Sequence, residues 1–172
     1  GARECGRRIG TRTQRLDAQW HSQRFHIIGL QEARTPKGTL HTEHYRIWSS
    51  GCVGPDAVRL GCELWCHTSL VLATAPDGRQ LTLADFVVVV LHADPRRLFV
   101  RFECVAMTFS MVVLHTPCLQ KTKGQGHRPI DDISNWWEET SQLCATSLRD
   151  ELVWYMVDAN APLATTATAS FG

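Results

Sequence analysis

The sequence predicts an α/β or α+β domain, and three observations support this. Apolar runs rich in Val, Ile and Phe recur along the chain and are separated by turn signals. A pattern with the period of a helix spans residues 130–148, between two such runs. The runs that flank this helix predict a βαβ unit, whose two strands are parallel. The strands in the middle of the chain follow one another across short turns, so the sheet is expected to be antiparallel there.

The elements are predicted in the following order. Residues 12–24 indicate a polar helix with a thin apolar face at Leu16 and Trp20. Strands are predicted from the apolar runs at 25–32, 44–50, 60–73, 86–92, 97–103, 107–115 and 151–157. The stretches "TPKG" and "APDG" mark turns between strands. In the helix at 130–148, Trp136 and Trp137 are predicted to anchor the core.

Composition narrows the class of protein. The chain has 172 residues, of which 44% are hydrophobic, enough for one domain with a sizeable core. A net charge of +1 gives no general attraction to nucleic acid. Basic clusters such as Arg96, Arg97 and Arg101 are expected to lie on the solvated surface. Seven scattered cysteines, an odd number, favour a reducing compartment. No apolar run reaches the ~18 residues of a membrane span, so a soluble intracellular protein is expected.

Three apolar runs end on polar residues that can carry chemistry. "FHIIGLQE" ends on Glu32, "SMVVLHTP" carries His115, and "YMVDAN" ends on Asp158 and Asn160. If the three strands point the same way, their carboxyl ends share one edge of the sheet, where open α/β sheets hold ligands. These four side chains are therefore predicted to converge.

Each of these residues also has an ordinary explanation on its own. An Asp or Asn after a strand commonly forms a turn, a Glu there is commonly solvated, and a His commonly makes a rim hydrogen bond. Together, two carboxylates, an amide and an imidazole suit metal-assisted hydrolysis. Mg²⁺ takes one or two carboxylates together with substrate phosphate oxygens, and histidine exchanges protons near neutral pH.

The motifs "IIGLQEAR", "VVLHTP" and "MVDANAPL", in this order, resemble the endonuclease/exonuclease/phosphatase superfamily. Within it, they are most similar to the endonuclease domains of non-LTR retrotransposons. The resemblance covers about residues 12–163 and implies an α/β sandwich with a mixed β-sheet. By the same resemblance, Glu32 matches the metal-binding Glu, Asp158 the Asp that activates water, and Asn160 the amide that contacts the scissile phosphate. His115 stands where some members carry a catalytic His.

Two parts of the family pattern have no counterpart here. The first residues, "GARECGRRIG", contain no metal-binding Asn and are not strand-like, and no Ser-Asp-His type motif follows Asn160. The resemblance therefore implies a basic N-terminal segment at 1–11, a partial domain at 12–163 whose C-terminal part is missing, and a polar tail at 164–172.

The function implied by the resemblance is that of a phosphodiesterase dependent on Mg²⁺, or on Mn²⁺, which nicks DNA. The implied partner is the DNA phosphate backbone, the implied location is the nucleus, and a fusion to a reverse transcriptase is expected in a longer protein. Because two motifs are absent, these 172 residues are expected to be inactive alone. Two alternatives stay open: a degenerate, non-catalytic binding module, and a phosphatase of the same superfamily.

Overall fold

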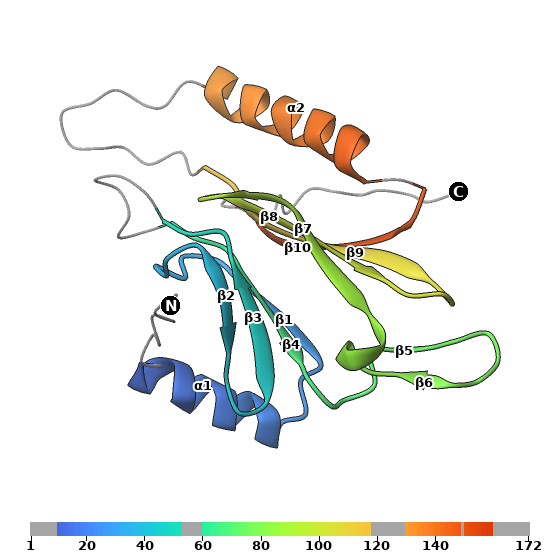
Figure 1. The fold of residues 1–172 in the computed structure, drawn as a ribbon. Helices are drawn as coiled ribbons and strands as arrows, with labels where there is room; N and C mark the ends of the chain where they lie inside the picture. The colour runs from blue at the N-terminus through green and yellow to red at the C-terminus, as the bar shows by residue number, and fades with distance from the viewer. Residues whose placement is uncertain (1–9, 53–59, 118–129, 149, 160–172) are drawn as a thin grey trace, which may run out of the picture.

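Two four-stranded β-sheets lie face to face, and one helix covers the outer face of each (Figure 1). The structure, a computed structural model, describes residues 10–52, 60–117, 130–148 and 150–159. Its elements are α1 (Thr11–Ser22), β1 (Ile27–Leu30), β2 (Gly38–His41), β3 (Tyr45–Ser49), β4 (Glu63–His67), β5 (Ala73–Thr74), β6 (Gln80–Leu81), the 3-10 helix η2 (Leu83–Asp85), β7 (Val87–Asp94), β8 (Arg97–Glu103), β9 (Thr108–His115), α2 (Ile130–Ser147) and β10 (Leu152–Asp158).

The first sheet has the strand order β1-β4-β3-β2 and is antiparallel throughout. The second has the order β10-β9-β8-β7. In it only β9 and β10 are parallel, and α2 connects them, which confirms the predicted βαβ unit. β5 and β6 form a separate small hairpin. The architecture is thus α/β with several sheets, and strands outnumber helices among the described residues.

The inner faces of the two sheets form the main hydrophobic core. Leu64 and Cys66 of the first sheet belong to the same buried cluster as Phe102, Met111 and Val113 of the second. Since β9 has this core on one side and α2 on the other, nearly all of its residues are buried. This two-sided burial explains why "SMVVL" is a continuous apolar run rather than an alternating one.

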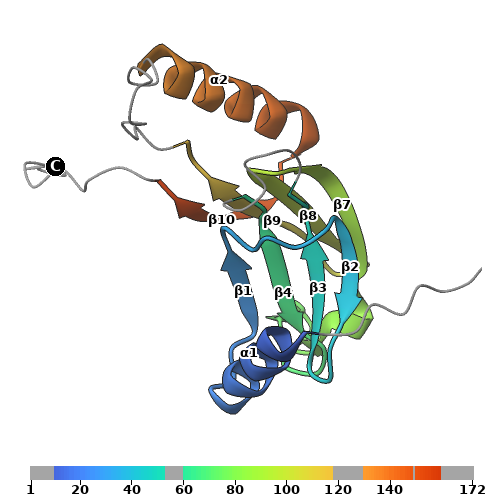
Figure 2. The same cartoon turned by 90° about the vertical axis from the view of Figure 1, so that its left-hand side faces the viewer.

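Each helix packs through a narrow apolar face, as the sequence predicts. In α1, Trp20 packs edge-on against Trp65 of β4, with ring centroids 4.8 Å apart. In α2, Trp136 is buried against the second sheet, whereas Trp137 is 39% exposed, so the prediction that both anchor the core is wrong for Trp137. Figure 2 shows α1 and α2 on opposite outer sides of the two sheets.

Three sequence-based expectations are corrected. The strand predicted at 60–73 ends at His67, because Nδ1 of that ring accepts the backbone N–H groups of Ser69 and Leu70 and turns the chain. Strand β2 had not been predicted. The clustered Arg97 and Arg101 are buried rather than solvated, and they hold the segment around α2 through ion pairs.

None of the helices in the described part of the chain combines the length and the apolar character that crossing a bilayer requires.

Candidate functional site

The candidate site lies where an edge strand of one sheet meets an edge strand of the other. β1 borders the first sheet and β10 borders the second. The amide Nε2 of Gln31, just after β1, donates to the backbone oxygen of Met156 in β10 at 3.2 Å. At Gly29 a Cβ atom would lie 2.4 Å from the Met156 sulfur. The absence of a side chain at Gly29 therefore allows the two strands to approach.

Glu32 is the second residue after β1, and its side chain is half-exposed. Its backbone has a φ of 52°, in the left-handed region that non-glycine residues seldom occupy. Oε1 lies 3.9 Å from Nε2 of His115, and Oε2 lies 3.9 Å from Nη2 of Arg34. Both distances exceed hydrogen-bond length, so these neighbours leave the carboxylate oxygens open to water or a cation.

His115 ends β9 and is 5% exposed. Its backbone N–H donates to the oxygen of Arg96, whose Nη1 donates in turn to the His115 oxygen. Nδ1 is buried and has no hydrogen-bond partner among the described residues. Burial, and then the charge of Arg96, lower the pKa of His115, against the opposing effect of Asp158 and Glu32. The ring is therefore held neutral near pH 7.

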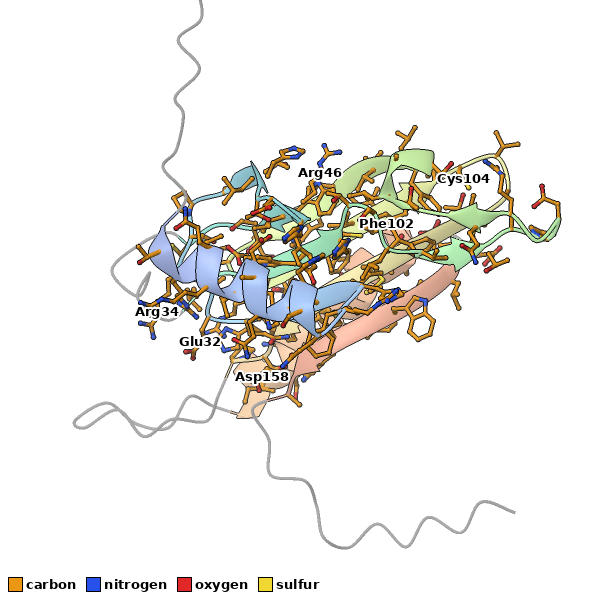
Figure 3. All side chains as sticks on the ribbon, turned by 90° about the horizontal axis from the view of Figure 1, so that it is seen from below. Glu32, Arg34, Arg46, Phe102, Cys104 and Asp158 are labelled. Atoms are coloured by element: carbon orange, nitrogen blue, oxygen red, sulfur yellow. The ribbon has the colours of Figure 1, made fainter. Side chains whose placement is uncertain are left out.

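Asp158 is the last residue of β10 and pairs in register with His115 across the parallel strands. Its backbone oxygen accepts the N–H of Thr116 at 3.0 Å, and its side chain is exposed. Figure 3 shows Glu32, Arg34 and Asp158 at one corner of the molecule. Asn160, the fourth predicted residue, lies outside the described residues.

Glu32 and Asp158 each lie beside His115, as predicted, but the predicted basis for this arrangement is wrong in one respect. The three strands were expected to share one edge of one sheet. Instead, Glu32 follows a strand of the first sheet, while His115 and Asp158 end strands of the second. Packing of the two sheets at β1 and β10, rather than strand order within a sheet, brings the residues together.

The donor set fits a hard divalent cation. Mg²⁺ takes oxygen ligands and keeps several waters. The half-exposed Glu32 can supply a carboxylate oxygen, and the exposed Asp158 lies within electrostatic reach of the same imidazole. The neutral, buried His115 can accept or donate one proton at Nε2.

Sequence reasoning did not identify two residues that position this site. Arg96 supports His115 through paired backbone and side-chain hydrogen bonds. Gln31 fastens β1 to β10. The sequence places Arg96 in a basic cluster that is expected to be solvated, and Gln31 stands there only as the neighbour of Glu32. Nothing in the turn sequence "DPRR" predicts a contact between Arg96 and His115, because that contact depends on the pairing of β8 with β9.

A cavity of about 150 Å³ lies elsewhere, on the outer face of the first sheet beside the start of α1. Its lining includes the carboxylate of Glu63, which accepts hydrogen bonds from Thr35 and from the indole N–H of Trp65. Those bonds satisfy both carboxylate oxygens, so Glu63 has a structural role there.

The sequence was also compared with known proteins; no protein-family model matches it, and no match was found among curated proteins.

Proposed function

We propose that this chain carries the site of a metal-dependent phosphodiesterase of the DNA-nicking endonuclease type. The observation that supports the proposal is the meeting of Glu32, His115 and Asp158, which lie far apart in the sequence and on two different sheets. A carboxylate beside a neutral imidazole, and a second carboxylate close to the same ring, are groups that take part in metal-assisted hydrolysis of a phosphodiester.

Each residue has a distinct role in this proposal. Glu32 would hold Mg²⁺ or Mn²⁺, which when bound neutralises charge that develops on phosphate oxygens. Asp158 would accept a hydrogen bond from the attacking water and orient it. His115 would exchange a proton at Nε2, because its Nδ1 is buried. Asn160 would donate to the phosphate, as the family resemblance implies.

The partner in the proposal is the phosphate backbone of DNA. Arg34 lies beside Glu32 with its side chain 51% exposed, and Arg96 lies beside His115. A guanidinium next to a carboxylate–metal centre can bind a phosphate oxygen that the metal does not. The contact would be insensitive to base sequence, because it involves only the backbone.

Metal-dependent DNA binding tests the proposal. Mg²⁺ is expected to raise the melting temperature of the chain and to tighten binding of a short DNA duplex, and Glu32→Gln should remove most of both effects. Glu138→Gln, at an exposed position of α2, is the matched control and should behave as the wild type. Equal effects of Mg²⁺ on the wild type and on Glu32→Gln would contradict the proposal.

One observation favours the non-catalytic binding module as the second candidate. His115 is the one imidazole that the described residues place beside Glu32, and one ring on one side of the site cannot both stabilise charge on the phosphate and transfer the proton. We therefore expect no nicking of supercoiled plasmid by these 172 residues in Mg²⁺ or Mn²⁺. Nicking that disappears with Asp158→Ala would favour the endonuclease over the binding module, and would show that fewer groups suffice.

A further inference from the structure

A second group of ligand-type side chains lies at the opposite end of the first sheet from Glu32. It combines Asp17 of α1 with Glu43 and His44, which connect β2 to β3. One ligand atom from each of the three residues lies within 4.8 Å of the other two. The group differs from a simple cluster of acidic residues, because an imidazole nitrogen faces both carboxylates.

Asp17 is the unusual member, since it is a carboxylate on the buried side of a helix. It is 4% exposed. Its Oδ1 accepts the hydroxyl of Thr42 and the backbone N–H of His44. Its Oδ2 accepts no hydrogen bond from the described residues and lies 4.0 Å from Nε2 of His44. None of the ion pairs formed within the described ranges joins Asp17 to a Lys or Arg. A buried carboxylate is ordinarily paired with a cation or coordinates a metal.

The neighbouring histidines leave one ring free to bind a metal. Nδ1 of His67 accepts the backbone N–H groups of Ser69 and Leu70, so the proton of His67 is on Nε2. That proton is donated to Nδ1 of His21 at 2.9 Å. His21 and His67 are therefore bonded to each other. The ring of His44 stacks on His21 with centroids 3.6 Å apart, and its Nε2 faces Asp17 and Glu43.

We infer that Asp17, Glu43 and His44 form a binding site for a divalent transition-metal ion, of which Zn²⁺ is the representative. Bonds of about 2.0–2.2 Å to nitrogen and oxygen would suit one imidazole and two carboxylates, with water as the fourth ligand. His44 Nε2 lies 3.9 Å from Glu43 Oε1, and the Glu43 side chain is 82% exposed, so it can rotate inward to close the site. The Thr42 hydroxyl and the His44 N–H orient Asp17, as outer hydrogen bonds commonly do for metal ligands.

The consequence for the fold is a cross-link between α1 and the turn that joins β2 to β3. α1 has few other attachments to this turn, since its apolar face is thin and contacts the sheet through Leu16 and Trp20. Bound metal would stabilise the folded state by an amount that grows with the logarithm of the ratio of metal concentration to Kd. The site is independent of the proposed phosphodiesterase function, because it shares no residue with Glu32, His115 or Asp158.

Calorimetric titration with ZnCl₂ tests the inference on the whole chain. We expect one strong Zn²⁺ site in the wild type. The affinity should be at least about tenfold weaker in Glu43→Gln, which removes one of the three protein ligands. Glu43 is exposed, so this variant is expected to fold normally, and circular dichroism checks that it does. Asp17→Asn keeps an oxygen that can accept the hydrogen bonds of Thr42 and His44, and it should weaken Zn²⁺ binding at least as much as Glu43→Gln does. Glu138→Gln, at an exposed position of α2, is the matched control and should retain wild-type affinity.

Free cysteines are a competing source of Zn²⁺ binding, and Co²⁺ distinguishes them. Absorption of the Co²⁺-loaded chain should lack thiolate charge-transfer bands if nitrogen and oxygen are the ligands. Three outcomes would overturn the inference. They are no Zn²⁺ binding by the wild type, equal Zn²⁺ affinity in the wild type and in Glu43→Gln, or thiolate charge-transfer bands in the Co²⁺-loaded forms of both proteins.

Discussion

The thiols of Cys62 and Cys66 show how strongly the inter-sheet core changes ordinary side-chain chemistry. Both are fully buried between the sheets. Burial raises the pKa of each to about 12, from an ordinary value of 9.0. Because the thiolate is the reactive form, these two residues are inert small core residues rather than metal ligands or nucleophiles.

Alkaline pH should therefore destabilise the protein through these thiols. Their folded-state pKa values lie above the unfolded ones, so the stabilisation is fully present below pH ~8.5 and is lost as pH rises toward 12. Each thiol should steepen the fall in unfolding free energy by about 1.4 kcal/mol per pH unit above pH ~9. In denaturant unfolding measured from pH 7 to 10.5, the free energy of unfolding should fall less steeply with pH for Cys66→Ala than for the wild type. Parallel curves would show that Cys66 ionises as easily in the folded state as in the unfolded one.

Arg101 provides a second test at the residue scale, because it faces two carboxylates that differ in burial. The side chain of Glu151 is 5% exposed, lies 3.0 Å from Nε of Arg101 and also accepts the Ser110 hydroxyl. The side chain of Glu103 is 42% exposed and lies 3.7 Å from Nη1 of Arg101. The two pairs share one guanidinium, so a comparison of the two glutamates separates burial from charge.

Glu151→Gln should cost about 3–5 kcal/mol of unfolding free energy, because it leaves a buried guanidinium without its main counter-charge. Glu103→Gln should cost less than about 1 kcal/mol, since solvent screens the exposed pair. Urea unfolding of both variants provides the measurement. Similar losses of unfolding free energy in the two variants would mean that burial adds little to the strength of the ion pairs of Arg101.

Among the elements, β1 and β10 hold the two sheets together at the candidate site. A Cβ at Gly29 would lie 2.4 Å from the Met156 sulfur and 2.9 Å from the Met156 Cβ. The sulfur can rotate away, but the Met156 Cβ moves only with its backbone. Gly29 is thus a position where a larger side chain would force the two strands apart.

Gly29→Ala is expected to destabilise the fold by about 1–3 kcal/mol through overpacking, and to move β1 away from β10. It should also weaken Mg²⁺-dependent stabilisation, because Glu32 follows β1. Met156→Ala in the same chain should recover part of both losses, and a double-mutant cycle gives the coupling. Additive effects of the two substitutions would show that the strands do not depend on this contact.

The elements also show what the sequence could predict and what it could not. Periodicity at Ile133, Trp136 and Leu143 identified α2, and hence the parallel pair of strands around it. Strand β2 was missed because "GTLH" is short and half polar. The division of strands between two sheets was missed because an apolar run indicates burial but not the sheet to which a strand belongs. His21, His44 and His67 come together only through pairing of strands and packing of α1, so spacing gave no signal.

At the scale of the whole molecule, both outer edges of the second sheet carry exposed apolar side chains. On β10 these are Leu152, Trp154, Tyr155 and Val157, and on β7 they are Val87, Val89 and Val90. Neither strand contains the Lys or Pro that commonly protects an edge. Edge strands of this kind pair readily with other chains.

The purified chain should therefore self-associate as its concentration rises. Trp154→Lys places a charge on the β10 edge and should lower the apparent mass measured by light scattering. Val105→Lys is the matched control, because Val105 is fully exposed but lies in the turn between β8 and β9. An equal effect of the two substitutions would indicate that net charge, rather than the β10 edge, controls association.

The meeting of β1 with β10 also has a consequence for the order of events during synthesis and folding. Glu32 leaves the ribosome more than a hundred residues before Asp158, so the first sheet can form while the site still lacks two of its three described residues. A ligand that needs all three can bind only after the sandwich has closed. Ligand binding at this site would then depend on the docking of the two sheets. Backbone hydrogen exchange should therefore slow in both sheets together when the ligand binds.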